Sequence, residues 1–125
     1  MNKTFKLSLA TLAFVLSTTI ANAQFSMDSD GKTIRNSSNS SVGRIDSNGI
    51  TIRNVNNSSV GRVDSDGKSI RNSSNSTVLK IDGNDIRNST NSVIAKMSDV
   101  LSVIKGAKPT AIYMALWWFI VKGNK

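Results

Sequence analysis

The chain has 125 residues, of which 16 are lysine or arginine and 8 are aspartate, and it contains no histidine, cysteine or glutamate. Without cysteine, neither a disulfide framework nor a cysteine-linked lipid anchor can form. The formal net charge of +8 favours anionic partners.

Residues 1–23 have the features of a secretory signal peptide. Two lysines precede an apolar run over residues 7–16, and Ala21-Asn22-Ala23 fits a cleavage site. The run is shorter than the ~20 residues that a membrane-spanning helix needs, which argues against the alternative of an anchor. We therefore predict export through the Sec pathway, to the periplasm, the outer envelope or the medium. The mature chain would begin at Gln24 and hold 14 basic residues against 8 aspartates, because Lys3 and Lys6 leave with the signal.

Residues 24–106 are dominated by an internal repeat of 18 residues. The triplet Ile-Arg-Asn occurs four times at spacings of 18, 18 and 16 residues, beginning at Ile34, Ile52, Ile70 and Ile86. In each copy, two short apolar groups are separated by Ser, Asn, Asp and Gly, which predicts a β-hairpin. The strands of the first copy are expected at residues 32–36 and 42–46, joined by the turn 37–40. Asp-Gly or Asn-Gly pairs between copies predict the tight turns that lead to the next hairpin.

The strand count predicts an all-β fold, a small symmetric β-barrel of about ten short antiparallel strands. Four copies supply eight strands. Residues 25–28 resemble the second strand of an incomplete copy, and residues 100–105 resemble the first strand of another. Pairing of these two segments would close a ring of five units and remove the open edges of the sheet. A β-solenoid is the competing architecture, but hairpin turns within each copy disfavour parallel coils.

Residues 107–125 predict a hydrophobic helix that completes the same domain. The stretch 109–121 is uncharged and mostly apolar; Pro109 suits a first helical turn and Gly123 suits a helix end. A helix of about 13 residues is roughly 20 Å long, too short to cross a bilayer of ~30 Å. Since a helix that is apolar on every side belongs in a core, we expect it to be packed inside the barrel.

The expected packing can be stated residue by residue. A ten-stranded barrel with strands ~4.8 Å apart and tilted ~40° has a radius of about 10 Å, the distance at which one helix packs against the surrounding sheet. The inward neighbours of the helix would be Ile45, Val63 and Ile81. Gly43 and Gly61 would let the strand backbone approach it closely.

The repeated motif reads Ile-Arg-Asn-Ser-Ser-Asn-Ser-(Ser/Thr)-Val-Gly-Arg-Ile-Asp-Ser-Asp-Gly. In this motif and in the Trp/Phe-rich terminus that follows it, the chain resembles the 5-fold β-flower proteins. The resemblance covers residues 24–125. It implies a small secreted bacterial protein with a shallow β-barrel of repeated hairpins, tubby-like in outline, and a hydrophobic terminal helix. It implies no particular activity. Val55 in place of a turn serine and Leu79 in place of glycine depart from the pattern.

Catalysis, cofactors and metals find little support in the residues. The eight aspartates are the only acidic side chains, and isolated aspartates in solvent-facing turns lack a cause for the shifted pKa that acid–base chemistry requires. The Asp-Ser-Asp-Gly segments at residues 28–31 and 64–67 resemble the start of a calcium loop but lack its distal glutamate. Nucleic-acid binding is not expected, because the aromatic residues are not interleaved with the basic ones. We predict a non-enzymatic protein without cofactor or metal.

Two groups of residues are candidates for interaction. A ring of arginines that could face an anionic partner consists of Arg35, Arg53, Arg71 and Arg87. The alternative is a solvated face balanced in part by Asp46, Asp64 and Asp82. The second group, Trp117, Trp118 and Phe119, either fills the core or contacts lipid.

These candidates lead to two functional hypotheses, and a hydrolase is the third alternative. The first is a secreted or envelope-associated structural or interaction module whose partner is an unknown protein or envelope component. The second is a membrane-associating protein that uses the aromatic helix and the basic face on an anionic lipid surface.

Overall fold

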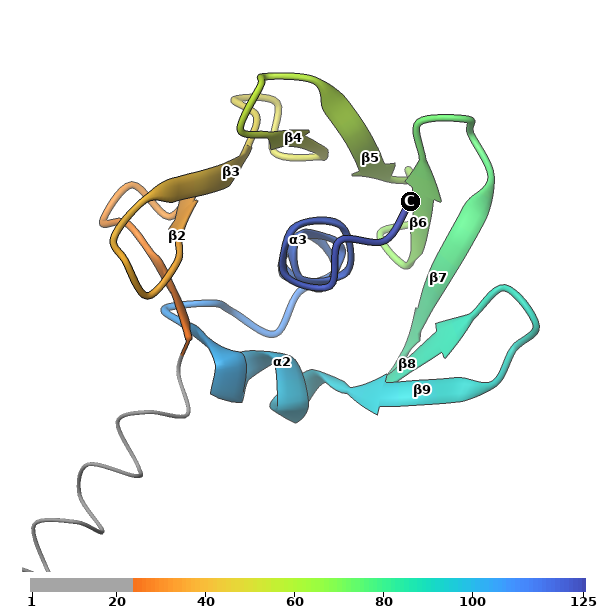
Figure 1. The fold of residues 1–125 in the computed structure, drawn as a ribbon. Coiled ribbons are helices and arrows are strands. Elements are labelled where there is room, and N and C mark those ends of the chain that lie inside the picture. Colours follow the sequence, from red (N-terminus) through yellow and green to blue (C-terminus); the bar gives the residue numbers. More distant parts are fainter. Residues whose placement is uncertain (1–23) are drawn as a thin grey trace, which may run out of the picture.

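The computed structural model describes residues 24–125, so the predicted signal peptide lies outside the described residues. These residues form ten short strands, two helices and a π-helical turn (Figure 1). The strands are β1 (Phe25–Met27), β2 (Thr33–Arg35), β3 (Ser41–Ile45), β4 (Thr51–Asn54), β5 (Ser59–Val63), β6 (Ser69–Asn72), β7 (Thr77–Asp82), β8 (Asp85–Asn88), β9 (Val93–Lys96) and β10 (Ile104–Lys105). The helical elements are α2 (Met97–Val103), α3 (Ala111–Leu116) and η1 (Trp117–Val121). The predicted hairpin repeat is therefore present.

The side chains alternate between the two faces of the strands, as the repeat predicted. The isoleucine of each Ile-Arg-Asn triplet is completely buried, while the residues beside it face outward. The ladder register shifts immediately after each of these isoleucines, at Ile34, Ile52, Ile70 and Ile86. A β-bulge bends and twists its strand. Repetition of the bulge in four hairpins therefore curls the sheet around a centre.

The Asn-Ser turns are held by the asparagine of the same triplet. In the β4–β5 turn, the Asn54 side-chain oxygen accepts hydrogen bonds from the backbone N–H groups of Asn56 and Ser58, both at 3.0 Å. Asn57 adopts a φ of +66°, a left-handed conformation that asparagine tolerates better than most residues. The other three Asn-Ser turns repeat this geometry, with positive φ at Asn39, Asn75 and Asn91.

The expected closure of the sheet into a barrel is wrong. The strand order is β10-β1-β2-β3-β4-β5-β6-β7-β8-β9, and β9 and β10 lie at opposite ends of it. The predicted pairing of the two end segments is confirmed, because Phe25 lies opposite Ile104 and Ser26 opposite Lys105, but β10 runs parallel to β1 rather than antiparallel. The sheet stays open because α2, and not a strand, follows β9. The sheet is thus mixed but largely antiparallel, and it is not closed by hydrogen bonds.

The predicted strand over residues 100–105 is wrong for its first four residues, because they belong to α2. Apolar residues in this segment recur with a helical spacing: Val100 is completely buried, and Met97 and Leu101 pack partly against the core. The Asp99 carboxylate accepts a hydrogen bond of 2.9 Å from the Lys96 backbone N–H, which satisfies a free donor at the start of the helix. α2 lies next to β9 in the ring of elements (Figure 1), and β10 follows it in the chain.

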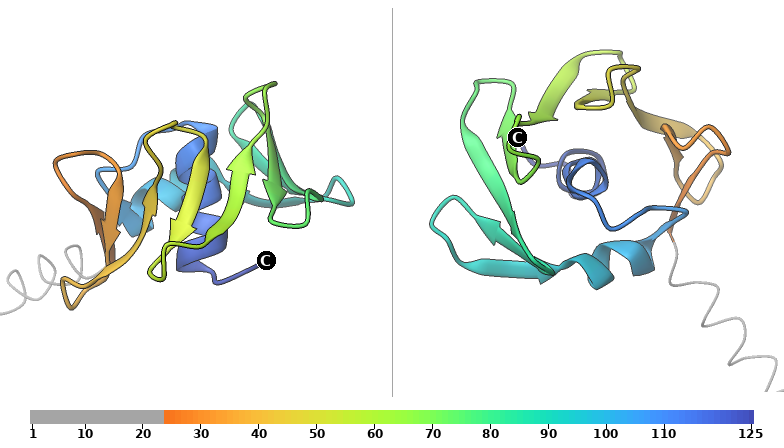
Figure 2. Two further views of the ribbon diagram at one scale, coloured as in Figure 1. Left: turned by 90° about the horizontal axis from the view of Figure 1, so that it is seen from above. Right: turned by 180° about the vertical axis from the view of Figure 1, so that it is seen from behind.

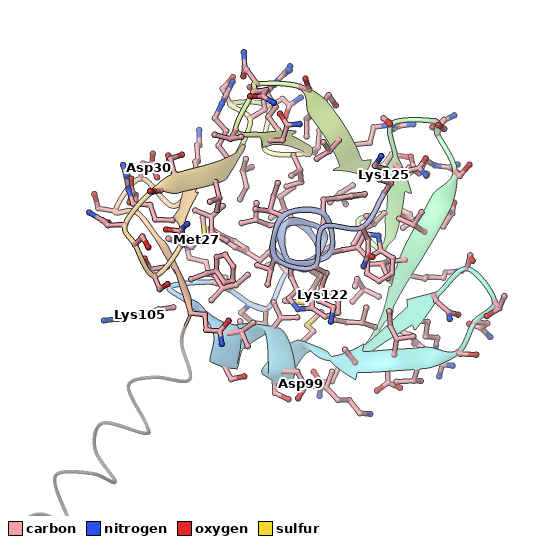
Figure 3. The ribbon with its side chains drawn as sticks, viewed as in Figure 1. Met27, Asp30, Asp99, Lys105, Lys122 and Lys125 are labelled. Atoms are coloured by element: carbon pink, nitrogen blue, oxygen red, sulfur yellow. The ribbon has the colours of Figure 1, made fainter. Side chains whose placement is uncertain are left out.

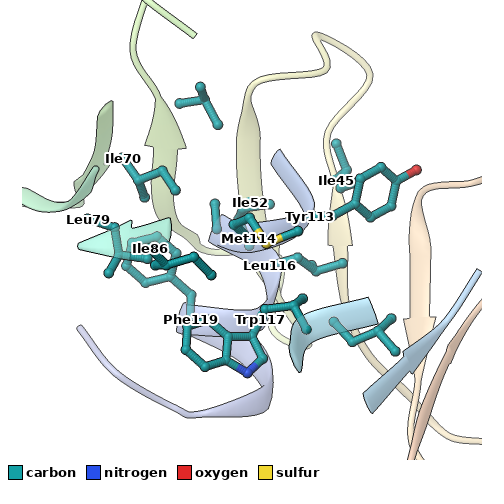
Figure 4. Close-up of a cluster of buried hydrophobic side chains, with 14 of the residues drawn as sticks. Ile45, Ile52, Ile70, Leu79, Ile86, Tyr113, Met114, Leu116, Trp117 and Phe119 are labelled. Carbon is teal, nitrogen blue, oxygen red and sulfur yellow. The ribbon is translucent and has the colours of Figure 1, made fainter. Parts of the chain in front are cut away.

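The predicted central helix is confirmed. α3 and η1 form one continuous rod in the middle of the curled sheet (Figures 1 and 2). The rod begins at Ala111 rather than Pro109, and it ends before Gly123, whose φ of +68° suits a helix end. The Tyr113 hydroxyl donates a hydrogen bond of 2.9 Å to the Gly31 carbonyl, which ties the rod to the β1–β2 turn. Its buried residues pack against the inward isoleucines of the strands (Figure 4).

A single helix has no repeat symmetry, and the strands adapt to it at one position of the repeat. A Cβ atom at Gly43 would lie 2.8 Å from Ile120 Cδ1, and one at Gly61 would lie 2.2 Å from Phe119 Cε2. In the third copy the same position holds Leu79, which is completely buried. The glycines therefore leave room for the large side chains of the rod, as predicted. At the equivalent position of the third copy, the Leu79 side chain itself is part of the buried core.

Candidate functional site

The four arginines of the predicted ring lie on the outer face of the sheet, where polar side chains surround the fold (Figure 3). Each is half-buried and reaches an aspartate at the end of the preceding strand. The Nε–Oδ distances are 2.8 Å for Arg35–Asp28, 3.1 Å for Arg53–Asp46, 2.9 Å for Arg71–Asp64 and 3.3 Å for Arg87–Asp82. Each guanidinium also donates to the carbonyl of the left-handed asparagine of the next turn, at 2.9–3.1 Å. The arginines thus fasten neighbouring turns together.

A second basic series lies beside the first. Arg44 is directly opposite Arg53 in the β3–β4 ladder, and Arg62 is opposite Arg71 in the β5–β6 ladder. Like charges in such pairs repel. Asp46 lies within 3.4 Å of both guanidiniums of the first pair and offsets that repulsion. Asp64 serves the second pair in the same way, with its longer contact at 3.7 Å.

The asparagines of the turns complete these groups. The Arg44 guanidinium donates a hydrogen bond to the Asn57 side-chain oxygen, and Arg62 donates to that of Asn75. We call each set of two basic residues, one aspartate and one turn asparagine an outer cluster. The part played by these asparagine side chains was not predicted from the sequence. Their signal was the constant spacing of 13 residues from arginine to asparagine.

The electrostatics of the outer clusters favour fixed, paired charges. The backbone N–H of Ser47 and the Arg53 guanidinium hold the pKa of Asp46 below its usual range. The hydrogen bond from Arg71 is the main cause of the lowered pKa of Asp64. Both carboxylates are therefore ionised at neutral pH, and each cluster of two arginines keeps an excess of one positive charge. The arginine ring is not free of counter-charges, which agrees with the alternative of a partly balanced face.

Replacement of Arg71 by glutamine is expected to lower the free energy of unfolding by about 1 kcal/mol. The change removes a half-exposed ion pair and a hydrogen bond to the Asn75 carbonyl, each of modest value at a surface. Urea denaturation followed by circular dichroism measures this difference. Glutamine in place of the exposed Lys108 is the matched control, and an equal loss in both variants would contradict a fastening role for Arg71.

The Asp-Gly turn at residues 64–68 holds its own carboxylate tightly. Asp66 accepts hydrogen bonds from the backbone N–H groups of Lys68 and Ser69, both at 2.8 Å, and from the Ser69 hydroxyl at 2.6 Å. These bonds, led by the hydroxyl, lower the pKa of Asp66 to about 2. Asn48 occupies the same place in the preceding copy and accepts the two backbone bonds without a charge.

This turn predicts a specific loss of stability in acid. The folded-state pKa of Asp66 is below its ordinary value of 3.8, so its contribution is complete above pH ~4 and disappears as the pH falls toward about 2. We expect unfolding free energies measured in urea to fall over this interval. Asp66→Asn, which copies the turn at Asn48, should show a smaller fall. An identical pH profile in the variant would show that the turn carboxylate does not contribute.

The aromatic candidates at the C-terminus lie in the rod. Trp117 and Phe119 are buried, with 9% and 5% of their surface exposed, and Trp118 is half-buried. Figure 4 shows Trp117 and Phe119 among the inward side chains of the sheet. The Lys122 ammonium lies 5.9 Å from the centre of the Trp117 ring. In this structure the candidates therefore contribute to the core.

Neither a metal site nor a membrane-spanning helix is found in the described part of the chain. Within residues 24–125, no three His, Cys, Asp or Glu side chains are grouped so that they could hold a metal ion. The aspartates of the calcium-like segment at residues 28–31 are engaged otherwise, Asp28 with Arg35 and Asp30 with the backbone of its own turn. None of the helices in the described residues is sufficiently long and apolar to span a bilayer.

Comparison with protein families gives a match over most of the chain. The model of the 5-fold beta-flower protein family matches residues 15–114, which include all four hairpin copies and the start of α3. Neither the curated proteins nor the solved structures gave a match.

Proposed function

The chain belongs to the 5-fold beta-flower protein family, and from this premise we propose that it is a non-enzymatic structural or interaction module. We also propose that it is exported through the Sec pathway, and that it then stays in the periplasm, stays in the outer envelope, or is secreted. Its partner would be a protein or another envelope component. We also infer that α2, β10 and β1 together take the place of a fifth unit, beside four hairpins, around α3.

The observation that carries the proposal is the rigid outer surface. Every Asn-Ser turn is fixed twice, by its own asparagine side chain and by an arginine that reaches its backbone. Fixed turns lose little conformational entropy when they bind a partner. The lowered pKa values of Asp46, Asp64 and Asp66 further favour a non-enzymatic role, since a general acid at neutral pH needs a raised value.

Site-specific cross-linking in intact cells of the source organism tests this proposal. A photoreactive residue would be placed at Val55, which is 68% exposed at the tip of the β4–β5 turn, and for comparison at the buried Ile52. We expect a discrete adduct from the turn position in the envelope or secreted fraction and none from the buried one. Recovery of the protein solely from the cytosol, or no adduct from any Asn-Ser turn, would contradict the proposal.

Membrane association through the aromatic helix and the basic face is the second candidate. Half-exposure of Trp118 and the excess positive charge of the outer clusters favour it. Burial of Trp117 and Phe119 weighs against it, because both must leave the core to insert. Quenching of tryptophan fluorescence by a lipid-confined quencher separates the two candidates. A module that presents its turns predicts no quenching by anionic vesicles.

A further inference from the structure

The third outer cluster is built differently from the two before it. Lys80 occupies the position of Arg44 and Arg62, opposite Arg87 in the β7–β8 ladder. Lysine lacks the guanidinium fork with which Arg62 contacts both an aspartate and an asparagine. The space remains as a cavity of about 240 Å³, which we call the Lys80 notch. Its lining residues are Lys68, Lys80, Ile81, Asp82, Arg87 and Asn91.

Arg87 has two acidic neighbours on either side of the shortened turn between β7 and β8: Asp82, and Asp85, whose Oδ2 lies 3.7 Å from Arg87 Nη2. Arg87 Nε lies 3.3 Å from Asp82 Oδ2, yet its N–H is out of line for a hydrogen bond and is buried without an acceptor. In the other three copies the equivalent Nε atom, of Arg35, Arg53 or Arg71, donates to its aspartate at 2.8–3.1 Å. The side chain of Asp82 is 68% exposed, against 21% for Asp46. The notch thus holds an unused buried donor beside a carboxylate that has room to turn outward.

The charge of the notch is suited to an anion. The notch is lined by three basic residues, Lys68, Lys80 and Arg87, and by one carboxylate, that of Asp82, whereas Asp85 lies outside the lining and pairs with both Arg87 and Lys96. Asp66 also interacts electrostatically with Lys80 and keeps its negative charge although its oxygens accept the bonds of its own turn, so an excess of one positive charge remains at the notch. Lysine ammonium and arginine N–H groups together are typical ligands of phosphate. A cavity of about 240 Å³ exceeds the ~30 Å³ that one water occupies, so there is room for an oxyanion with part of its hydration.

From these observations we infer that the Lys80 notch binds a phosphate group, either as free inorganic phosphate or as a phosphate monoester on a larger molecule such as a lipid. Lys68 and Lys80 would hold its charge, and Arg87 Nε would donate to one of its oxygens. The inference goes beyond the proposed function and is independent of it, because the turns can meet a partner whether or not the notch is filled.

The first copy provides an internal comparison. Ser26 lies opposite Arg35, at the position that Lys80 holds opposite Arg87. A pocket of about 260 Å³ is lined by Ser26, but Arg35 is not among its lining residues, and Lys105 is the one basic residue that lines it. This pocket, with one basic lining residue, is not expected to bind phosphate. Several basic side chains and an open pocket therefore occur together at the Lys80 notch.

The test is a titration of the purified protein with inorganic phosphate at constant ionic strength, followed by calorimetry and by the NMR signal of Arg87 Nε–H. We expect saturable binding of one phosphate and a shift of that signal. Lys80→Arg keeps the charge but supplies the fork that fills the notch, so it should weaken binding at least about tenfold, as Lys80→Ala should. The control variant Lys108→Ala, which changes an exposed lysine away from the notch, should alter the affinity for phosphate by less than about twofold. Thermal melts of all variants verify folding.

A second arm distinguishes the two sources of phosphate. Neutral vesicles doped with a phosphate-monoester lipid are compared with vesicles doped to the same surface charge with a phosphodiester lipid. Binding to the first alone, lost in Lys80→Arg, would identify a lipid phosphate, and binding of inorganic phosphate alone would identify a solute. No saturable binding in either arm overturns the inference. Undiminished binding by Lys80→Arg, or equal binding to both vesicle types, also overturns it, because charge alone would then account for the affinity.

Discussion

Alanine in place of Gly61 is expected to destabilise the protein by about 3 kcal/mol, the upper part of the range typical for overpacking a core. The added Cβ would lie 2.2 Å from Phe119 Cε2 and 2.8 Å from the backbone oxygen of Arg71. The ring cannot rotate away freely, since Phe119 is buried at 5% exposure. The backbone oxygen belongs to β6, which pairs with β5 through Gly61 and Asn72. Relief of the clash would therefore displace either the rod or a ladder.

Alanine at Gly43 is the matched comparison, because this glycine has the same place in the preceding copy. Its added Cβ would lie 2.8 Å from the end of the Ile120 side chain and 3.1 Å from the Arg53 backbone oxygen. Ile120 is less buried than Phe119, so its side chain has more room to shift. We expect a loss of about 1 kcal/mol there. Equal losses at the two glycines, measured by urea denaturation, would contradict the packing described here.

A double-mutant cycle isolates the contact itself. Phe119→Leu removes the ring atoms that the new Cβ would meet, although the contact with the Arg71 oxygen stays. The cost of Gly61→Ala should therefore be smaller in the Phe119→Leu background, with a coupling of about 1 kcal/mol or more. The same background should leave the cost of Gly43→Ala unchanged. Strict additivity of Gly61→Ala and Phe119→Leu would show that the glycine is required for another reason.

The repeat explains how much of the fold could be predicted from sequence. Strand periodicity and turn residues are local properties, so the hairpins and the inward isoleucines followed directly from the spacing of Ile34, Ile52, Ile70 and Ile86. The helix at residues 97–103 and the direction of the last strand could not be predicted from this spacing. Residues 100–105 have the composition of a strand, but Asp99 caps a helix there and Val100 is buried by helical spacing. The parallel pairing of β10 with β1 depends on where α2 ends, which is a tertiary property.

The candidate site shows a similar division. The sequence predicted one arginine of the ring in each copy. The partners of these arginines depend on the register of the ladder, in which Arg53 lies diagonally from Asp46. Lys80 was visible as a change from the arginine of earlier copies. Its consequence was not, because the notch also requires the shortened turn that loosens the contact of Asp82 with Arg87.

Truncation of the chain after Lys108 is expected to abolish cooperative folding. The deletion removes α3 and η1, and with them the buried side chains Tyr113, Met114, Leu116, Trp117 and Phe119. Loss of a large buried side chain costs about 2–5 kcal/mol, so five of them together cost about 10–25 kcal/mol, which matches or exceeds the ~5–15 kcal/mol that stabilises a small domain. The inward isoleucines would then face water on a curled, open sheet. Circular dichroism and thermal melting of the truncated protein measure the outcome.

Deletion of residues 123–125 alone is the control for this truncation, because it leaves the rod complete and removes mainly exposed residues. That variant should keep its β-sheet signal and melt within a few degrees of the full chain, as expected for a change of about 1 kcal/mol or less. The two hypotheses for Trp117 and Trp118 demand opposite results from the longer deletion. A core rod requires the sheet to unfold without it, whereas a membrane anchor requires the sheet to stay folded and only to lose its affinity for lipid. A truncated protein that melts cooperatively in solution would therefore contradict the core role of the rod and would favour membrane association as the function.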